Sequence, residues 1–218
     1  MLQTFGWDGF LFLVRGAGWT LALFLSSMVV GSLLALPLSI LRVLAPKPIR
    51  LLVAGYIEIV EATPLLVLIF ITFFGLSFLG FHFPPLTAAG AALSLYTAAY
   101  CADIWRGCIE AIPRQQWEGG RALALTQGQQ LRYVILPQAF KIALSPTVGF
   151  MVQLLKNSSL TALIGFVELT RAGQIMNNMT FQPFRVFLTV AAIYFVMCYP
   201  LSLLSQKLSG GENARRAG

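Results

Sequence analysis

Two carboxylates interrupt one of the apolar stretches of this 218-residue chain and are its first candidates for binding chemistry. Glu58 and Glu61 are one helical turn apart, so a helix would present both on the same face. Pro64 follows and removes the helical hydrogen bond to the Val60 carbonyl, which predicts a kink. A charged side chain inside an apolar span costs about 2.5–3.5 kcal/mol on insertion scales and by default marks a functional site. With the Thr63 hydroxyl as a weaker candidate, this group predicts a site for a cationic ligand.

Glu61 has an alternative role, because a cation of the same chain could neutralise it. Lys156 and Arg171 are the candidate partners for such an ion pair. Both roles stay open at this point: Glu61 either meets an ammonium group or basic side chain of a ligand, or it stabilises the fold by pairing.

A second polar group stands in a later apolar stretch. Asn157 and Ser158 could accept a zwitterion, but such side chains also form interhelical hydrogen bonds of about 0.6 kcal/mol each. The structural role is favoured for Ser158, and the role of Asn157 stays open. The hydroxyl of Tyr100 is a weaker candidate, since a neighbour usually satisfies a single hydroxyl in a membrane helix.

Asp103 and Arg106 are also one turn apart on an expected helix, and their charges are opposite. This spacing predicts an ion pair. The pair lies near the end of an apolar stretch, so we expect it to brace the loop that follows and not to touch a ligand.

That loop is a polar segment, residues 112–137, set between long apolar stretches. Pro113 suits the first position of a helix, because the N–H that proline lacks has no helical partner there. A first short helix can therefore run from Pro113 to about residue 125.

A second short helix is predicted over residues 127–135. Thr126 and Gln129 have the spacing of a capping box, in which each side chain binds the backbone N–H of the other residue. Pro137 disfavours helical geometry in the residue before it, so we expect this helix to end there.

The elements that must position these residues follow from composition. Hydrophobic residues make up 57% of the chain and charged residues 11%, against about 25% charged in soluble domains. Crossing a bilayer takes about 20 apolar residues in a helix, and five stretches qualify: 16–41, 51–78, 86–108, 139–165 and 184–208. The predicted fold is an all-α integral membrane domain over residues 1–209 with five transmembrane helices, followed by a flexible tail, 210–218.

The basic residues predict the orientation of these spans. Eleven of the fifteen Lys and Arg residues follow the first span, surround the connection between the third and fourth, or follow the fifth. Because short cytoplasmic loops carry the basic excess, we expect the N-terminus outside and the C-terminus and the 112–137 loop in the cytoplasm. The same bias explains the net charge of +7, so nucleic-acid binding is not expected.

The 112–137 segment resembles the EAA loop of the membrane subunits of ABC importers, which forms a cytoplasmic coupling helix. Glu118, Leu136 and Pro137 fit the pattern of that loop. The resemblance implies that the ATPase-coupling residues are Glu118, Gly119, Gly120, Arg121, Ala124, Leu136 and Pro137.

Three positions depart from the EAA pattern. Gly119 and Gly120 replace the usual alanines, and Ala124 stands where the family normally has glycine. All three side chains are small, so close docking of the helix is still expected, although each glycine weakens a helix by roughly 1 kcal/mol relative to alanine.

Over residues 10–208 the chain resembles the permeases of polar amino-acid ABC importers. It rests on the stretches 18–23, 58–66, 100–107, 155–160 and 168–172. In that family the position of Glu61 is commonly Arg, in an Arg-Gly-Thr-Pro sequence, so the acidic residue is a departure that bears on substrate choice.

The resemblance implies a transport subunit without enzymatic activity, in the bacterial inner membrane. Its expected partners are a second permease, identical or homologous, a cytoplasmic ABC ATPase dimer, an external substrate-binding protein, membrane lipid and an amino-acid substrate. The sequence contains no Gly-x-x-x-x-Gly-Lys-Ser/Thr phosphate loop, so ATP and Mg are expected on the partner ATPase and no cofactor or metal on this chain.

Two other classes of function would leave features in the sequence. A secondary transporter or channel should hold a complete pore or a pair of repeats in one chain, and no repeat is evident. A membrane enzyme should cluster nucleophiles, bases or metal ligands in a cavity, whereas this chain has one histidine and dispersed carboxylates.

Overall fold

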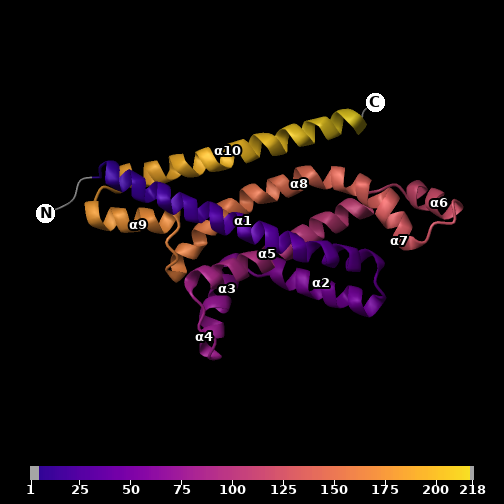
Figure 1. Ribbon diagram of the computed structural model, residues 1–218, viewed down its shortest axis with the longest axis horizontal. Coiled ribbons are helices and arrows are strands. Elements are labelled where there is room, and N and C mark those ends of the chain that lie inside the picture. The colour runs from indigo at the N-terminus through magenta and orange to yellow at the C-terminus, as the bar shows by residue number, and fades with distance from the viewer. Residues whose placement is uncertain (1–4, 217–218) are drawn as a thin grey trace.

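The computed structural model describes the backbone of residues 5–216 and the side chains of residues 5–209, and every regular element within these limits is helical. Four long helices run along the long axis of the molecule (Figure 1): α1 (Trp7–Leu44), α5 (Pro85–Glu110), α8 (Leu136–Asn157) and α10 (Pro183–Arg216). The shorter helices are α2 (Lys47–Ala62), α3 (Leu65–Phe70), α4 (Leu76–Phe78), α6 (Arg114–Ala122), α7 (Gln127–Gln130) and α9 (Leu169–Thr180). Two π-helical turns, η1 (Ile71–Gly75) and η2 (Leu131–Ile135), and a 3-10 segment, η3 (Ser158–Ile164), join them.

Three helical stretches of the described chain are long and apolar enough to cross a membrane: Trp7–Leu44, Gln127–Ile164 and Pro183–Ser209. The bent pair Lys47–Ala62 and Leu65–Phe78 would make a fourth span. The helix α5 could extend about 39 Å at 1.5 Å per residue, but its sequence, rich in Ala, Thr and Tyr, is less apolar. The all-helical membrane fold therefore agrees with the prediction, and the count of five spans stays a prediction.

The kink expected at Pro64 is a complete break between α2 and α3. Thr63 has extended backbone angles, φ −95° and ψ 127°, as expected for a residue that precedes proline. The two helices meet at an angle of 105°. The α3–α4 arm consequently turns away from the bundle of long helices (Figure 1).

Pro137 does not end a helix, and that prediction is wrong. The chain continues from α7 through η2 directly into α8, with Pro137 in the first turn of α8. In η2 the N–H of Leu136 donates to the carbonyl of Leu131, five residues earlier. This wider turn lies just before the proline and lets the helix pass a residue that cannot donate a hydrogen bond.

The C-terminal segment predicted as a tail, 210–218, is helical as far as Arg216 because α10 extends through it. Residues 217–218 lie outside the described part of the chain. The flexibility predicted for this segment stays a prediction.

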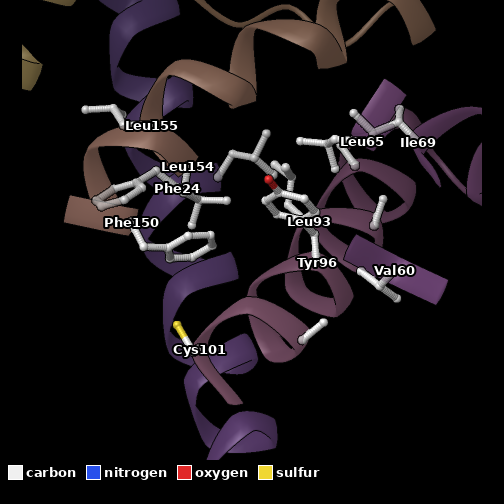
Figure 2. Close-up of a cluster of buried hydrophobic side chains, with 14 of the residues drawn as sticks. Phe24, Val60, Leu65, Ile69, Leu93, Tyr96, Cys101, Phe150, Leu154 and Leu155 are labelled. Atoms are coloured by element: carbon white, nitrogen blue, oxygen red, sulfur yellow. The ribbon is translucent and has the colours of Figure 1, made fainter. Parts of the chain in front are cut away.

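The packing of α1 against α5 depends on small residues. Ser27, Gly31 and Ala35 are buried at four-residue intervals on α1, the pattern that lets membrane helices approach closely. A Cβ atom at Gly31 would lie 2.4 Å from the Cβ atom of Thr97 on α5. Beside this contact a hydrophobic cluster fills the centre of the bundle, with side chains that include Phe24, Leu93, Tyr96, Phe150 and Leu154 (Figure 2).

One helix is missing from the prediction. Residues 168–183 were expected as a connection, but α9 occupies most of that stretch and packs on α1 and α10. Its cap is Glu168, whose buried carboxylate accepts hydrogen bonds from the backbone N–H groups of Thr170 and Arg171. α9 lies at the opposite end of the molecule from α6 and α7 (Figure 1).

Candidate functional site

A polar cleft of about 540 Å³ opens where the 112–137 segment meets the ends of α1 and α5. Its apolar wall comes from α1, α5 and the second residue after α5, and its polar wall from α5, α6 and α7. The lining residues are Val43, Leu44, Ile109, Glu110, Ile112, Arg114, Trp117, Glu118, Arg121, Gln127 and Gln130. We call this the loop cleft.

One face of α6 lines the loop cleft. Arg114, Trp117, Glu118 and Arg121 follow the spacing of three, four and seven residues that brings side chains onto one side of a helix. Within the described side chains, the ion pairs are those of Arg106, so Glu118 and both arginines of this face have no ionic partner. The cleft therefore offers charges of both signs to a partner.

Gly119 and Gly120 differ sharply in their surroundings. A Cβ atom at Gly119 would meet nothing within 4 Å, whereas one at Gly120 would lie 2.8 Å from Cγ of Gln130. Gln130 is only 2% exposed, and its amide nitrogen donates to the Leu125 carbonyl at 3.1 Å. Gly120 is thus a contact inside the loop, and its role in coupling to an ATPase stays a prediction.

Ala124 follows α6 in a left-handed conformation, with φ 56°. The N–H of Ala124 donates to the Arg121 carbonyl, and the N–H of Leu125 to the Gly120 carbonyl. These bonds form a Schellman motif, in which glycine is the usual residue at this position. Ala124, which stands where the EAA pattern normally has glycine, therefore adopts a backbone conformation that is strained for alanine.

The other predicted loop residues form the start of the long helix that follows. The capping box of Thr126 and Gln129 is confirmed, with both reciprocal hydrogen bonds present. Leu136 packs against the cluster of Ile109, Ile112, Leu131, Ile135 and Ala139, and Pro137 is exposed.

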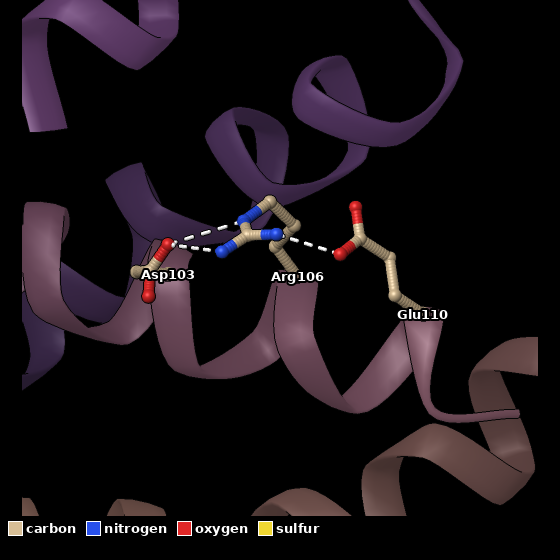
Figure 3. A network of polar contacts seen from close by, with 3 residues as sticks. All are labelled: Asp103, Arg106 and Glu110. Carbon is tan, nitrogen blue, oxygen red and sulfur yellow. Dashed lines mark hydrogen bonds and ion pairs between the residues drawn. The ribbon is translucent and has the colours of Figure 1, made fainter.

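The predicted ion pair of Asp103 and Arg106 is confirmed, at 2.7 Å (Figure 3). Arg106 also pairs with Glu110 at 2.6 Å, a contact that the sequence analysis missed although the i,i+4 spacing would have indicated it. Because Glu110 lines the loop cleft, Arg106 connects the cleft to the middle of α5.

Glu61 is exposed on the surface of the chain and is close enough to Asp103, Arg106 and Glu58 for their charges to affect it. Neither Lys156 nor Arg171 pairs with it in the described chain, and the role of Glu61 stays a prediction. We call Glu58, Glu61, Asp103, Arg106 and Glu110 the acidic face, because its four carboxylates outnumber its one guanidinium.

The remaining candidates divide into two environments. Thr63 donates to the Ile59 carbonyl at 2.7 Å, and buried Ser158 donates to the Leu155 carbonyl at 2.7 Å, so each hydroxyl is satisfied by a carbonyl about one turn earlier in the chain. Tyr100 and Asn157 interact with the hydroxyl of Tyr96. Tyr100 also stacks on Phe150, with ring centroids 5.5 Å apart.

Several residues of the site carry no sequence motif. In the sequence, Gln127 and Gln130 look like ordinary helix residues and Trp117 like a residue of an amphipathic helix. Only the fold places them in the loop cleft. Within the described side chains, no group of three or more His, Cys, Asp or Glu has the arrangement of a metal site.

Comparison with known proteins places this geometry in a family context. Residues 27–209 match the family described as binding-protein-dependent transport system inner membrane component. The probable amino-acid ABC transporter permease protein YckA of Bacillus subtilis (strain 168) is 34% identical, covering 88% of this chain and 84% of its own. The L-cystine transport system permease protein TcyB of the same strain is 33% identical, covering 87% and 81%. A crystal structure of an amino acid ABC transporter with histidines superposes with a TM-score of 0.85 and 35% identity, covering 89% of this chain and 91% of that one.

Proposed function

Because the chain belongs to the family of binding-protein-dependent transport system inner membrane components, we propose that it is the permease subunit of an ABC importer that carries a polar, cationic amino acid inward. Its relatives are ABC permease subunits, which favours this reading over a secondary transporter or channel. Proposed partners are a second permease, a pair of ATPases that bind ATP and Mg, and an external substrate-binding protein. The basic loops support an N-terminus outside and a C-terminus inside the cell.

The acidic face is the single observation that carries the choice of substrate. Glu58 and Glu61 are exposed where α2 breaks, and the unpaired Glu61 carboxylate requires a cation to offset its desolvation in a membrane. A relative whose name mentions L-cystine, and a transporter solved with histidines, support an amino acid as the cargo. In this proposal the ammonium or basic side chain of the substrate meets Glu61 as the path opens to either side in turn.

We expect Glu61→Gln to raise the apparent KM for uptake of cationic amino acids about tenfold or more. The glutamine keeps the size of the side chain but loses a charge-assisted hydrogen bond, which contributes about 1.5–3 kcal/mol. The measurement is uptake of radiolabelled lysine, arginine and glutamine by proteoliposomes that hold the complete importer and its binding protein. The KM for glutamine should change little where Glu61 meets the basic side chain of the substrate, and should rise as well where it meets the α-ammonium group.

Glu58→Gln is the matched control, because it removes the same charge one turn away. A similar loss in both variants would indicate a general field effect. An unchanged KM and substrate range in Glu61→Gln would overturn the role of Glu61 in binding.

The loop cleft supports a role for α6 in coupling. Its unpaired Glu118 and arginines can pair with charges of the ATPase, and Arg106 joins the cleft to the acidic face. ATP closure and substrate binding would then bias one equilibrium between two conformations, which is how alternating access is driven.

We expect Gly120→Ala to lower the amount of amino acid imported per ATP hydrolysed, while Gly119→Ala leaves this ratio unchanged. The added methyl group at Gly120 must displace buried Gln130, and α6 must shift with it, whereas the same group at Gly119 enters open space. Both changes favour the helix by roughly 1 kcal/mol, so the pair isolates the contact. Parallel ATPase and uptake assays on the reconstituted importer supply the ratio.

Shortening the facing side chain provides the rescue. In the double variant Gly120→Ala, Gln130→Ala the clash is absent, and coupling should recover toward the wild-type ratio. Equal ratios in the two single glycine variants would show that the Gly120–Gln130 contact does not set the position of α6.

A further inference from the structure

An apolar groove of about 670 Å³ runs along the outside of the bundle between α1, α5 and α8. Its polar atoms bind one another: the Trp105 indole donates to the Thr147 hydroxyl at 3.0 Å, and the Ser39 hydroxyl donates to the Leu36 carbonyl. The groove therefore presents almost only hydrocarbon to its surroundings. Its exposed walls are Val29, Leu33, Leu36, Phe140 and Leu144.

A cation follows the part of α1 that lines this groove and precedes the residues of α1 that line the loop cleft. Arg42 is one turn beyond Ser39 on α1, and helical neighbours at this spacing share a side of the helix. The Nε atom of Arg42 is buried and has no hydrogen-bond partner in the described chain. Since buried polar groups are nearly always paired, this guanidinium lacks an anion that its planar fork would bind well, such as a phosphate.

Part of the acidic face lies on another side of α5 from the groove. On α5 the groove is lined by Trp105 and Ile109, whereas Asp103 is two residues before Trp105, or about 200° around the helix. The exposed apolar walls of the groove suit the hydrocarbon of membrane lipid better than a polar substrate.

We propose that this groove is a binding site for one phospholipid, with an acyl chain along α1 and α8 and the phosphate group on Arg42. Apolar walls and an unpaired cation one helical turn from the groove-lining Ser39 complement both parts of such a molecule. The site does not depend on which amino acid is carried. A bound lipid there would fill the space between α1 and α8 beside the start of the 112–137 loop.

A photo-crosslinking experiment in the assembled importer tests the proposal. Leu33→p-benzoylphenylalanine places a reactive ketone at the rim of the groove, and irradiation in native membranes is followed by intact-mass analysis of the purified chain. We expect an adduct with the mass of a phospholipid. Adding Arg42→Ala should lower its yield about tenfold, from the loss of roughly 1.4 kcal/mol or more of charge-assisted binding.

Two controls separate the site from ordinary lipid contact. Arg50→Ala removes a cation at the start of α2 outside the groove and should leave the yield unchanged. Ser32→Phe fills the groove and should lower the yield, whereas Leu34→Phe, on the same helix but outside the groove, should not. A crosslink to a second copy of the chain or to the ATPase, or a lipid adduct unaffected by both Arg42→Ala and Ser32→Phe, overturns the proposal.

Discussion

Replacing Glu168 by alanine is expected to lower the free energy of unfolding by about 2–4 kcal/mol. The carboxylate is fully buried. It accepts four hydrogen bonds: from N–H of Thr170 at 2.9 Å, from N–H of Arg171 at 2.8 Å, from the Tyr194 hydroxyl at 2.8 Å and from the Thr20 hydroxyl at 3.5 Å. Loss of a helix cap costs about 0.5–2 kcal/mol. Each buried donor left unpaired adds about 1–3 kcal/mol.

The effect should concentrate where three helices meet. Thr20 belongs to α1, Thr170 and Arg171 to α9, and Tyr194 to α10, so the single carboxylate ties these elements together. Thermal unfolding of the purified permease in mild detergent measures the loss. Glu118→Ala, which removes an exposed glutamate, is the control and should shift stability by less than about 0.5 kcal/mol.

Glu168 also predicts a pH dependence. Burial raises the pKa of this carboxyl, and the hydrogen bonds from Thr170, Arg171, Tyr194 and Thr20 offset part of the rise. The folded state then binds the proton more tightly than the unfolded state, so the stability from this group is present below the unfolded pKa, about 4.3. It is lost as the pH rises through the folded pKa.

The matched variant for this test is Glu168→Gln, which cannot titrate. The stability of the wild-type protein minus that of the variant should fall as the pH is raised from 4 toward neutrality. A difference that stays constant over this range would contradict a raised pKa.

Rules for helix breaks and caps, applied to the sequence, predicted some positions of the fold correctly and others wrongly. Pro64 and Pro137 are chemically identical, yet one separates α2 from α3 by 105° and the other is absorbed in a continuous helix. The difference lies in η2, where a wider turn precedes Pro137. A rule that considers only the proline takes no account of the conformation of the turn before that proline.

The candidate site shows the same division. The Asp103–Arg106 pair was found from residue type and spacing because that contact is local, whereas Glu118 and Arg121 were indicated by the resemblance of the loop to the EAA pattern. The fit of Gly120 against Gln130 joins two helices across a turn, and the sequence shows only that both residues are compatible with a helix. The conformation of Ala124 was missed for the opposite reason, since alanine gives no signal for a left-handed position that glycine usually marks.

α9 was missed because its cap is unusual. Glutamate is not among the preferred N-cap residues, and the apolar positions of α9 are interrupted by Gln174, Asn177 and Asn178. The helix is stabilised by packing on α1 and α10, through the cluster of Leu13, Ala17, Leu169, Ala172, Met176, Val186 and Val190. Such long-range burial is not visible in a window of twelve residues.

A methyl group added at Gly31 is expected to destabilise the permease by about 3 kcal/mol, the upper part of the range for overpacked cores. The new Cβ atom would lie 2.4 Å from Cβ and 2.6 Å from Cγ2 of Thr97, and 2.9 Å from the Ser94 carbonyl oxygen. Two of these atoms are fixed by the backbone of α5, so the side chain of Thr97 cannot relieve the clash by rotating. α1 must move away from α5, and this separates Phe24 from the side chains around Leu93 (Figure 2).

Gly18 provides the matched control for Gly31→Ala, because it lies on the same helix and a Cβ atom there would meet nothing within 4 Å. Both substitutions favour helix formation by roughly 1 kcal/mol, and this shared gain cancels in the comparison. The remaining difference measures the α1–α5 contact, where small residues and not a hydrophobic driving force hold membrane helices together. Thermal unfolding in detergent and the amount of folded protein in the membrane supply the measurement, and equal midpoints for Gly31→Ala and Gly18→Ala would show that the two helices tolerate a wider spacing.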